Sequence, residues 1–336
     1  MTQLPEIKVD SVRKIFDDGN HNAFTDMCSF HGNMYLTFRS SPDGHQMFTS
    51  SRIVVLTSKD GLEWQKIHSF GVPLRDVRDP HFLIFQDKLF IYTSTWLCNP
   101  ATPGVFGNND HLGYAAWTSD GQHWEGPRSL EGTYGHYIWR AGTYSGKAYL
   151  CGRRVRDFTP TDGEEAKKAV MESALLESED GLVWRFCGLF QNEKGNETAF
   201  IFEDDGSVLA VARSRGENAM LCRAKPPYKD WTRTPLNHNV GGPLLIKWGK
   251  HYLVGGRKIP FGDNPKMVLS WLVGDKLEDM AELPSGGDTS YPGFIALSDS
   301  KALLSYYSSH EGSNSKLAPC SIYLAELSVW QTSKKI

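Results

Sequence analysis

The feature that most constrains this chain is a short motif that recurs at a fixed interval. Residues 58–64 read SKDGLEW, residues 118–124 read TSDGQHW and residues 178–184 read SEDGLVW. The tryptophans that end the three copies are separated by 60 residues in each case. A fixed period of this length is typical of folds that repeat one supersecondary unit.

Each copy of the motif predicts a tight turn between two strands. Asp-Gly is a favoured turn pair, and the hydroxyl side chain ahead of it can bond the local backbone. Apolar runs such as residues 53–56 and 174–176 precede the motif and are typical of strands.

A second pattern, in which a short turn separates two apolar runs, occurs six times. The six predicted hairpins are residues 28–39, 82–94, 142–153, 200–213, 244–256 and 294–307. Seven residues after the turn, three of them carry an arginine: Arg39, Arg153 and Arg213. Two hairpins per unit make a four-stranded antiparallel sheet, and six such sheets closed in a ring make a β-propeller.

We therefore predict an all-β fold, a six-bladed β-propeller that forms one catalytic domain over residues 1–336. A five-bladed ring is the alternative, because the last two units lack a clean Asp-Gly motif. We expect a strand at about residues 5–16 to pair into the last blade and close the ring. Residues 162–171 are expected to form a helix in an insertion between strands, and residues 98–111 a loop at the equivalent place one blade earlier.

Composition excludes several classes of partner. The net charge of −3 comes with no basic run, so neither nucleic acid nor a membrane surface is an expected partner. There is no apolar run of membrane-spanning length. The six scattered cysteines predict reduced thiols rather than a disulfide framework. No leader is visible, so the cytoplasm is expected; a chain whose leader had been removed would be periplasmic or secreted.

In a propeller, the innermost strand of each blade begins near the axis, so six segments meet in one shallow cup. These segments are residues 21–26, 76–81, 134–140, 195–200, 239–244 and 287–294. Their polar side chains are Asp26, Arg78, Asp79, His81, His136, Arg140, Glu197, Asp288 and Tyr291. The second strands return Arg39, Arg153, Arg213 and Arg257 to the same end. Ring-closing salt bridges would explain any one of these residues, but the set indicates an active site.

Two segments resemble the sialidase superfamily of propellers with Asp-box (BNR) repeats: residues 196–213 and residues 289–294. In sialidases the first carries a glutamate and a substrate-binding arginine, which Glu197 and Arg213 match. The second carries the nucleophilic tyrosine, which Tyr291 matches. The turn motifs resemble Asp boxes, although the family form usually has one more residue between Asp and Gly. The resemblance extends over nearly the whole chain at the level of fold and implies a glycosidase.

The chemistry of these residue types agrees with that implication. Tyrosine, with an ordinary pKa of about 10, is a poor nucleophile at neutral pH. An adjacent carboxylate can take its proton as attack begins. A neutral phenol also approaches an anionic sugar without the repulsion that a carboxylate would meet. Arginines hold a substrate carboxylate through two parallel hydrogen bonds.

The first blade departs from the family. Sialidases have an Arg-Ile-Pro-like segment there, whose arginine completes a triad, and this chain has Phe24-Thr25-Asp26. Arg39, Arg78 and Arg140 are the candidates to replace it, and sialic acid itself is in doubt as the substrate. The segment around Asp79 also resembles the second-blade motif of five-bladed fructosidase- and arabinanase-like glycosidases. In that case Asp26, Asp79 and Glu197 would be the catalytic carboxylates.

The favoured function is an exo-acting glycoside hydrolase that removes an acidic or unusual terminal sugar from a glycan. The predicted catalytic residues are Tyr291 and Glu197 as the nucleophile pair, with Asp79 or Asp26 as the general acid. The predicted substrate-binding residues are Arg39, Arg78, His81, His136, Arg140, Arg153, Arg213 and Arg257.

Two other classes share these features. A polysaccharide lyase would use Tyr291 or a histidine as base against a uronate, and a non-catalytic propeller would bind carbohydrate only. No metal-ligand spacing such as H-E-x-x-H and no phosphate-binding glycine loop occurs, so neither a metal nor a cofactor is predicted. The sequence leaves open the sugar, its linkage, retention or inversion, and the oligomeric state.

Overall fold

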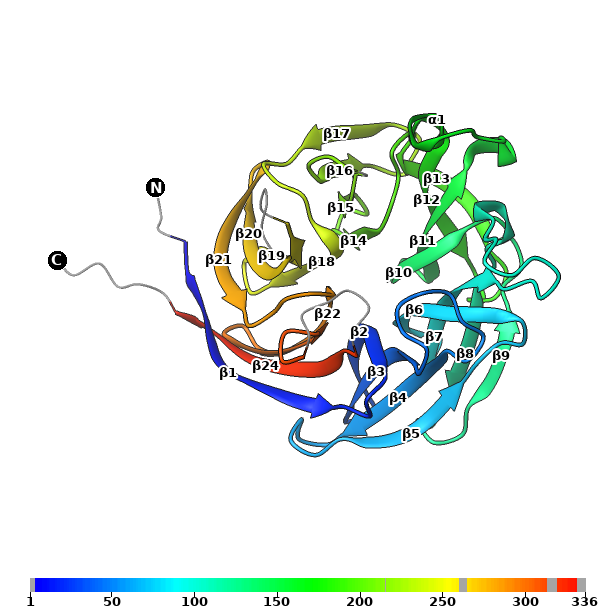
Figure 1. Ribbon diagram of the computed structural model, residues 1–336. Coiled ribbons are helices and arrows are strands. Elements are labelled where there is room, and N and C mark those ends of the chain that lie inside the picture. The colour runs from blue at the N-terminus through cyan, green and yellow to red at the C-terminus, as the bar shows by residue number, and fades with distance from the viewer. Residues whose placement is uncertain (1–3, 215, 260–264, 313–318, 331–336) are drawn as a thin grey trace.

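The computed structural model describes residues 4–214, 216–259, 265–312 and 319–330. In this part of the chain, 24 strands form six four-stranded antiparallel sheets. The sheets are arranged around a central axis as blades (Figure 1). The predicted six-bladed β-propeller is therefore confirmed, and the five-bladed alternative is wrong.

Blades 1 to 3 each use four consecutive strands, with the first strand of each next to the axis (Figure 1). Blade 1 contains β2 (His21–Phe30), β3 (Asn33–Ser41), β4 (Arg52–Ser58) and β5 (Gln65–Phe70). Blade 2 contains β6 (Arg75–Phe85), β7 (Lys88–Leu97), β8 (Tyr114–Thr118) and β9 (Glu125–Ser129). Blade 3 contains β10 (Tyr137–Tyr144), β11 (Lys147–Val155), β12 (Met171–Ser178) and β13 (Arg185–Gln191).

Blades 4 and 5 repeat this order, and blade 6 combines the two ends of the described chain. Blade 4 contains β14 (Thr198–Phe202), β15 (Val208–Ala212), β16 (Met220–Ala224) and β17 (Trp231–Pro235). Blade 5 contains β18 (Gly241–Trp248), β19 (His251–Lys258), β20 (Lys266–Val273) and β21 (Lys276–Leu283). Blade 6 contains β22 (Thr289–Ser298), β23 (Lys301–Ser308), β24 (Ser321–Trp330) and β1 (Glu6–Phe16).

Ring closure occurs as the sequence predicts. Strand β1 pairs antiparallel with β24, from Glu6 opposite Trp330 to Phe16 opposite Ile322. Figure 1 shows the two as the blue and red strands on the outer side of blade 6. The indole Nε1 of Trp271 in blade 5 also donates a 2.8 Å hydrogen bond to the carbonyl oxygen of Pro5.

The repeated motif forms the turn between the third and fourth strands of blades 1, 2 and 3. In blade 1, Oδ1 of Asp60 accepts a hydrogen bond from the backbone N–H of Leu62 at 2.7 Å. Gly61 adopts a φ of +76°, and Trp64 Nε1 donates to its carbonyl oxygen at 3.0 Å. Glycine is favoured here because non-glycine residues rarely adopt this conformation.

Blade 4 makes the same turn without the motif. Tyr228 occupies the glycine position with a φ of +61°, and Trp231 Nε1 donates to its carbonyl oxygen at 2.7 Å. The motif turns also pack against the neighbouring blade: a Cβ on Gly121 would lie 2.0 Å from the hydroxyl oxygen of Tyr35 in blade 1. The turns thus join adjacent blades as well as adjacent strands.

Both predicted insertions are present. The segment between β11 and β12 contains α1 (Glu164–Val170) and the 3₁₀ helix η2 (Arg156–Phe158), and the segment between β7 and β8 contains the 3₁₀ helix η1 (Asn108–Asp110). None of the helices in the described ranges is long and apolar enough to cross a membrane. Five of the cysteines are free thiols: Cys28, Cys98, Cys151, Cys187 and Cys222.

Removing β1 is expected to open the ring. A chain that lacks residues 1–16 leaves the edge of β24 unpaired and removes the acceptor of Trp271, so we expect it to lose the cooperative thermal transition seen by circular dichroism. A chain that lacks residues 1–3 keeps β1 and serves as the control. If the 1–16 deletion melts like the full chain, closure by β1 does not stabilise the fold.

Candidate active site

The innermost strands share a backbone irregularity that aims side chains at the axis. The pairing of first and second strands skips at a β-bulge in five of the six blades. At four of these bulges one residue has a positive φ: Phe24 (64°), Asp79 (53°), Gly242 (59°) and Tyr291 (53°). A bulge bends its strand and redirects a side chain, and it is a common device next to active sites.

Proline follows three of these residues, at Pro80, Pro243 and Pro292. Proline has no N–H to donate to the ladder, so within sheets it is confined to edges and bulges. A positive φ at Asp79 and Tyr291 is unfavourable for a non-glycine residue and is maintained only where the surrounding structure enforces it. The local sequence and the neighbouring blades together therefore fix these two side chains.

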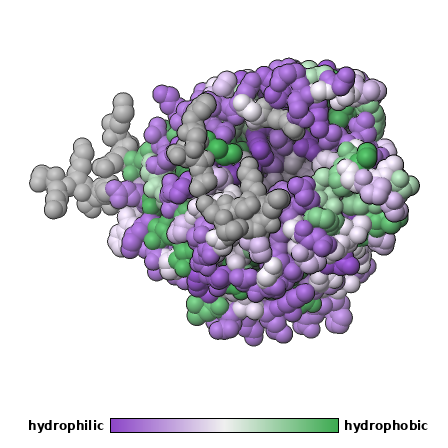
Figure 2. Space-filling model, in the orientation of Figure 1, coloured by the Kyte–Doolittle hydropathy of each residue, from purple (hydrophilic) through white to green (hydrophobic). Residues whose placement is uncertain are grey.

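The redirected side chains surround a cavity of about 200 Å³ at the axis. Figure 2 shows that this face of the ring is hollowed near its centre, with hydrophilic residues in the hollow. We call this cavity the cup. Its lining residues are Phe24, His45, Arg78, Asp79, Trp96, Tyr137, Trp139, Arg153, Glu197, Arg213, Arg257, Tyr291 and Tyr307.

The cup contains seven of the twelve residues predicted for the site. They are Tyr291, Glu197, Asp79, Arg78, Arg153, Arg213 and Arg257. The other five lie elsewhere: Asp26, Arg39, His81, His136 and Arg140.

Tyr291 and Glu197 form a direct pair across the axis. The hydroxyl of Tyr291 donates to Oε1 of Glu197 at 2.6 Å. The same oxygen accepts from Nη1 of Arg213 at 2.8 Å, and Oε2 accepts from the backbone N–H of Gly242 at 2.5 Å. Both side chains of the pair are buried.

The electrostatics of this pair favour a protonated phenol beside an ionised carboxylate. Burial alone would raise the pKa of Glu197, but the charge of Arg213 and the hydrogen bond from Tyr291 outweigh it and lower that pKa. Burial raises the pKa of Tyr291 well above its ordinary value, and the charges of Asp79 and Glu197 raise it further. Tyr291 therefore keeps its proton until a reaction draws it toward Glu197.

Asp79 lies at the floor of the cup. Its Oδ2 accepts hydrogen bonds from the hydroxyl of Tyr137 at 2.6 Å and from Nε1 of Trp139 at 2.8 Å. Its Oδ1 has no hydrogen-bond partner among the described residues. Burial raises the pKa of Asp79 to about 6, because the nearby charge of Arg78 only partly offsets the desolvation. This oxygen is also buried, like the rest of the side chain.

Four guanidinium groups line the cup, each held in a different way. Arg153 lies 5.0 Å above the ring of Tyr137 and 5.5 Å above that of Trp139. Nη1 of Arg257 donates to the carbonyl oxygen of Thr289 at 3.1 Å. Aromatic faces and carbonyl oxygens orient a guanidinium. Arg257 has a carboxylate neighbour as well, with Nη1 3.6 Å from Oδ1 of Asp288.

Arg78 and Arg213 each make a close ion pair with a carboxylate. Nε of Arg78 lies 2.5 Å from Oδ2 of Asp76, and its Cζ lies 5.6 Å from the centre of the Phe24 ring. Arg213 is paired with Glu197 but keeps a side chain that is 31% exposed. The cup is thus lined by four guanidinium groups together with the carboxylates of Asp79 and Glu197.

A cluster at one side of the cup was only partly identified from the sequence, which singled out Asp288 but neither of its histidine partners. Nδ1 of His45 lies 2.6 Å and Nε2 of His21 lies 2.9 Å from Oδ2 of Asp288. Among the described residues, this is the one group of histidine and carboxylate atoms close enough to hold a metal ion, with all three atoms within 4.8 Å of one another. However, Nη1 of Arg257 already lies 3.6 Å from Oδ1 of Asp288, which disfavours a second cation there.

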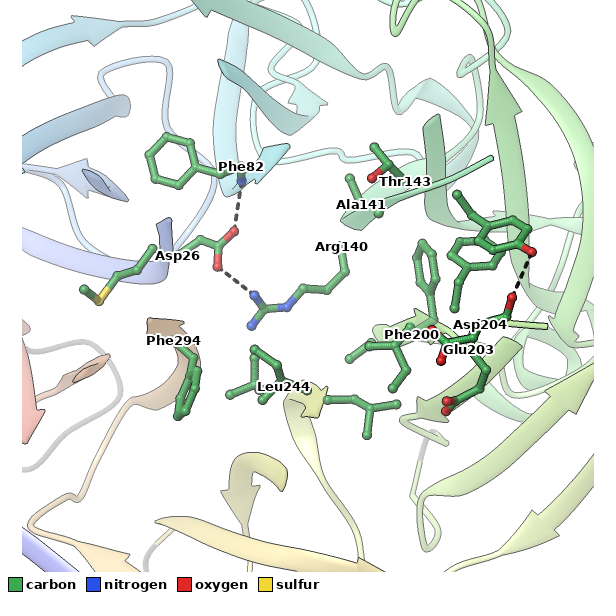
Figure 3. Close-up of a pocket in the computed structure, with 18 residues that line it drawn as sticks. Asp26, Phe82, Arg140, Ala141, Thr143, Phe200, Glu203, Asp204, Leu244 and Phe294 are labelled. Carbon is green, nitrogen blue, oxygen red and sulfur yellow. Dashed lines mark hydrogen bonds and ion pairs between the residues drawn. The ribbon is translucent and has the colours of Figure 1, made fainter. Parts of the chain in front are cut away.

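Asp26 and Arg140 lie beneath the cup, where Figure 3 shows their ion pair. Nη1 of Arg140 donates to Oδ1 of Asp26 at 2.8 Å, and Nη2 donates to the carbonyl oxygen of Pro292 at 2.6 Å. Nε donates to the carbonyl oxygen of Pro243 at 3.3 Å, and Oδ2 of Asp26 accepts from the N–H of Phe82 at 2.9 Å. This ion pair connects five blades and borders a second pocket of about 550 Å³, lined by residues further along the first strands.

The remaining predicted residues also lie outside the cup. His81 lies in the same layer as Asp26, with Nδ1 3.4 Å from its Oδ2. Arg39 is fully buried, and its Nη2 lies 2.7 Å from Oδ1 of Asp76. His136 is buried as well, and burial together with the charge of Arg154 lowers its pKa to about 4.

The fold and the site were then compared with known proteins. A scan against protein-family models found no match, and a search of curated protein sequences found none either. Among solved structures, a protein of unknown function from Dyadobacter fermentans has a TM-score of 0.80 and 19% identity, over 97% of this chain and 100% of that chain.

Two glycoside hydrolases are also similar in structure. A Trypanosoma rangeli sialidase in complex with sialic acid has a TM-score of 0.65 and 13% identity over 97% of this chain, which spans 58% of that chain. A family 117 glycoside hydrolase produced by Zobellia galactanivorans has a TM-score of 0.55 and 13% identity, over 99% of this chain and 92% of that chain. At these identities the likeness establishes a sialidase-like propeller fold and no more.

The ion pair beneath the cup is expected to be essential to stability. Arg140→Met would leave the Asp26 carboxylate buried without its cation, so we expect a loss of about 3–5 kcal/mol in the free energy of unfolding by urea. Adding Asp26→Asn should recover part of the loss. Arg223→Met removes an exposed pair with Asp275 and should cost less than about 1 kcal/mol. Equal effects of the two arginine variants would contradict this role.

Proposed function

We propose that this protein is a glycoside hydrolase that removes a terminal acidic sugar from a glycan. The observation that carries the proposal is the 2.6 Å hydrogen bond from the hydroxyl of Tyr291 to the carboxylate of Glu197. This pair lies in a cup that four arginines also line. An activated phenol next to several guanidinium groups is suited to attack a sugar that carries an anion.

The size of the cup supports removal of a single terminal residue. Pockets for drug-sized ligands are roughly 300–1,000 Å³, and the cup has about 200 Å³. One monosaccharide ring is therefore a better match than an extended chain, which supports exo action. Trp96, which is partly exposed, gives the cup an apolar face on which a sugar ring can pack.

The proposed reaction begins with attack by Tyr291. Its oxygen forms a bond to the anomeric carbon while its proton passes to Glu197, and the bond from that carbon to the leaving oxygen breaks. Arg213 and the N–H of Gly242 hold the carboxylate of Glu197 in place for the transfer. A solved complex of the Trypanosoma rangeli sialidase with 2,3-difluorosialic acid is described as a covalent intermediate. The proposal gives this chain a covalent intermediate of the same general kind.

The arginines would bind the anion of the sugar. Arg153, Arg213 and Arg257 approach the cup from second strands of blades 3, 4 and 5, so their forks converge from three directions. Arg78 adds a fourth guanidinium from blade 2. The substrate class proposed is a terminal sugar acid, either a hexuronic acid or a nonulosonic acid such as sialic acid.

Replacing the nucleophile tests the proposal directly. The assay uses 4-nitrophenyl glycosides of glucuronic, galacturonic and N-acetylneuraminic acid in both anomeric forms. Tyr291→Phe removes one hydroxyl, so we expect a loss of about 1 kcal/mol in stability at most. Turnover should fall by several orders of magnitude, because no oxygen is left to attack. A stable and fully active Tyr291→Phe would refute the mechanism.

Tyr92→Phe is the matched control for this experiment. Its hydroxyl is buried like that of Tyr291 and donates to the carbonyl oxygen of Gly181 at 3.0 Å, but it lies outside the cup. It should cost similar stability and leave turnover unchanged. Absorbance near the ultraviolet edge in a polymeric uronate product would instead identify a lyase, and binding without turnover would identify a carbohydrate-binding propeller.

Replacing a predicted anion ligand tests substrate recognition. Arg213→Lys keeps the charge but loses the planar fork, so we expect kcat/KM on the preferred sugar acid to fall by at least about tenfold, the effect of losing about 1.4 kcal/mol. Arg223→Lys, in an exposed ion pair of similar length, is the control. Unchanged kcat/KM in Arg213→Lys would remove Arg213 from the site.

A further inference from the structure

Hydrolysis by the proposed pair needs a group that protonates the departing oxygen, and the shape of the cup determines where this group lies. The sugar that reacts with Tyr291 occupies the cup, so the rest of the glycan extends through the open side. The departing oxygen is therefore at the rim. Its proton donor must lie within hydrogen-bond reach of that oxygen.

Asp79, one of the two aspartates predicted for this role, is poorly placed for it. Its side chain belongs to the floor and is 3% exposed, and one of its oxygens already accepts from Tyr137 and Trp139. Its Oδ1, which has no hydrogen-bond partner among the described residues, is buried as well and does not lie at the rim. Asp26, the other candidate, lies beneath the cup, paired with Arg140.

His45 is placed at the rim. It lines the cup, and its side chain is 34% exposed, in contrast to 5% for its partner Asp288. Its ring packs edge-on against Phe24 with 5.9 Å between centroids, and Phe24 packs against Tyr291 at 4.9 Å. The imidazole and the nucleophile therefore flank the same phenylalanine ring.

The two nitrogens of His45 have different surroundings. Nδ1 is hydrogen-bonded to Oδ2 of Asp288 at 2.6 Å, while Nε2 makes no hydrogen bond to any residue that the structure describes. A carboxylate at Nδ1 fixes the ring orientation and the tautomer. Nε2 is then the atom that can exchange a proton with a ligand.

Asp288 is itself held firmly. The hydroxyl of Tyr307 donates to Oδ1 at 3.0 Å, and His21 bonds to Oδ2 at 2.9 Å. Burial alone would raise the pKa of Asp288, but the hydrogen bonds of His21 and His45 outweigh it and hold that pKa far below its usual range. Asp288 therefore remains an anion behind His45.

We propose that His45, positioned by Asp288, is the general acid and base of this site, and that Asp79 binds the sugar. This inference rests on the proposed function. In the first step the bond from the anomeric carbon to the leaving oxygen breaks, and that oxygen takes its electron pair and a proton from Nε2. In the second step Nε2 takes a proton from water, whose oxygen attacks the anomeric carbon. The bond to Tyr291 then breaks, and the phenol recovers its proton from Glu197.

The test compares two leaving groups on one sugar acid that the unmodified protein turns over. Nitrophenolate can leave without being protonated. The leaving oxygen of a methyl glycoside must be protonated, and it departs as methanol. His45→Gln should lower kcat/KM for the methyl glycoside by about 10²- to 10⁴-fold. For the 4-nitrophenyl glycoside the same substitution should lower kcat/KM by less than about tenfold. Sodium azide, a nucleophile that needs no base, should raise kcat of this variant and yield a glycosyl azide.

Two other variants make the result specific. His123→Gln is the matched control, because its Nδ1 lies 2.6 Å from Oδ2 of Asp120 on an exposed turn outside the cup. Asp79→Asn should lower kcat/KM for both glycosides by similar factors. Equal losses for both glycosides in His45→Gln, or a leaving-group-dependent loss in Asp79→Asn instead, would overturn the assignment of His45.

The same panel separates this inference from the proposed function. If the unmodified protein turns over none of the sugar-acid glycosides, the proposed function fails. If it is active and Tyr291→Phe is not, but His45→Gln shows no dependence on the leaving group, only the role of His45 fails.

Discussion

The interaction on which the rest of this structure depends is the buried ion pair between Arg140 and Asp26. It crosses the axis just beneath the cup and satisfies hydrogen-bonding groups of five blades. Two of its acceptors, the carbonyl oxygens of Pro243 and Pro292, belong to the residues that follow bulge positions. The ion pair therefore fixes the backbone from which Gly242 and Tyr291 face the cup. A buried charge pair is weak evidence for stability in itself, but here it determines where several strands meet.

The bulges convert this framework into a site. In a regular strand, residues two apart face the same side, so a first strand would present equivalent side chains at successive depths along the axis. Beside the bulges, Asp79 lies in the cup and His81 one layer deeper, and Phe24 and Asp26 are related in the same way. One layer thus holds the chemistry and the next holds the ring together. The structure thus separates the residues of the proposed site from those that support it by depth rather than by blade.

This arrangement explains how far the sequence could be interpreted. The period of the motif turns and the six hairpins were sufficient to predict the blades and the closing strand, because both depend on local periodicity. Periodicity also placed Arg153 and Arg213 in the cup, but Arg39, at the same repeat position, turns instead to Asp76. The sequence identified the first strand of each blade, but not which of its residues lie in the cup and which lie beneath it. That depth depends on the bulges, which leave only a weak signal in the local sequence. The dipeptides at Asp79-Pro80 and Tyr291-Pro292 are that signal in hindsight.

His45 escaped sequence-based inference for a different reason. It lies between β3 and β4, outside any repeat, and its partner Asp288 is 243 residues away in the chain. Only tertiary structure brings such a pair together. Tyr137 and Trp139 lie in a segment that the sequence analysis had already identified as polar. Their place at the floor of the cup depends on their hydrogen bonds to Asp79, which a sequence does not show.

The pairing of β1 with β24 also has a consequence for the order of events during synthesis. The two strands lie about as far apart in sequence as the described chain allows, so blade 6 stays incomplete until β24 has been translated. Tyr291 belongs to that blade, while its partner Glu197 belongs to a blade made about a hundred residues earlier. Contacts of such long range carry a high entropic cost of closure and form late. A ribosome-bound chain would thus carry most of a folded propeller with Tyr291 and Glu197 not yet paired, and the proposed site would be complete only when the ring closes.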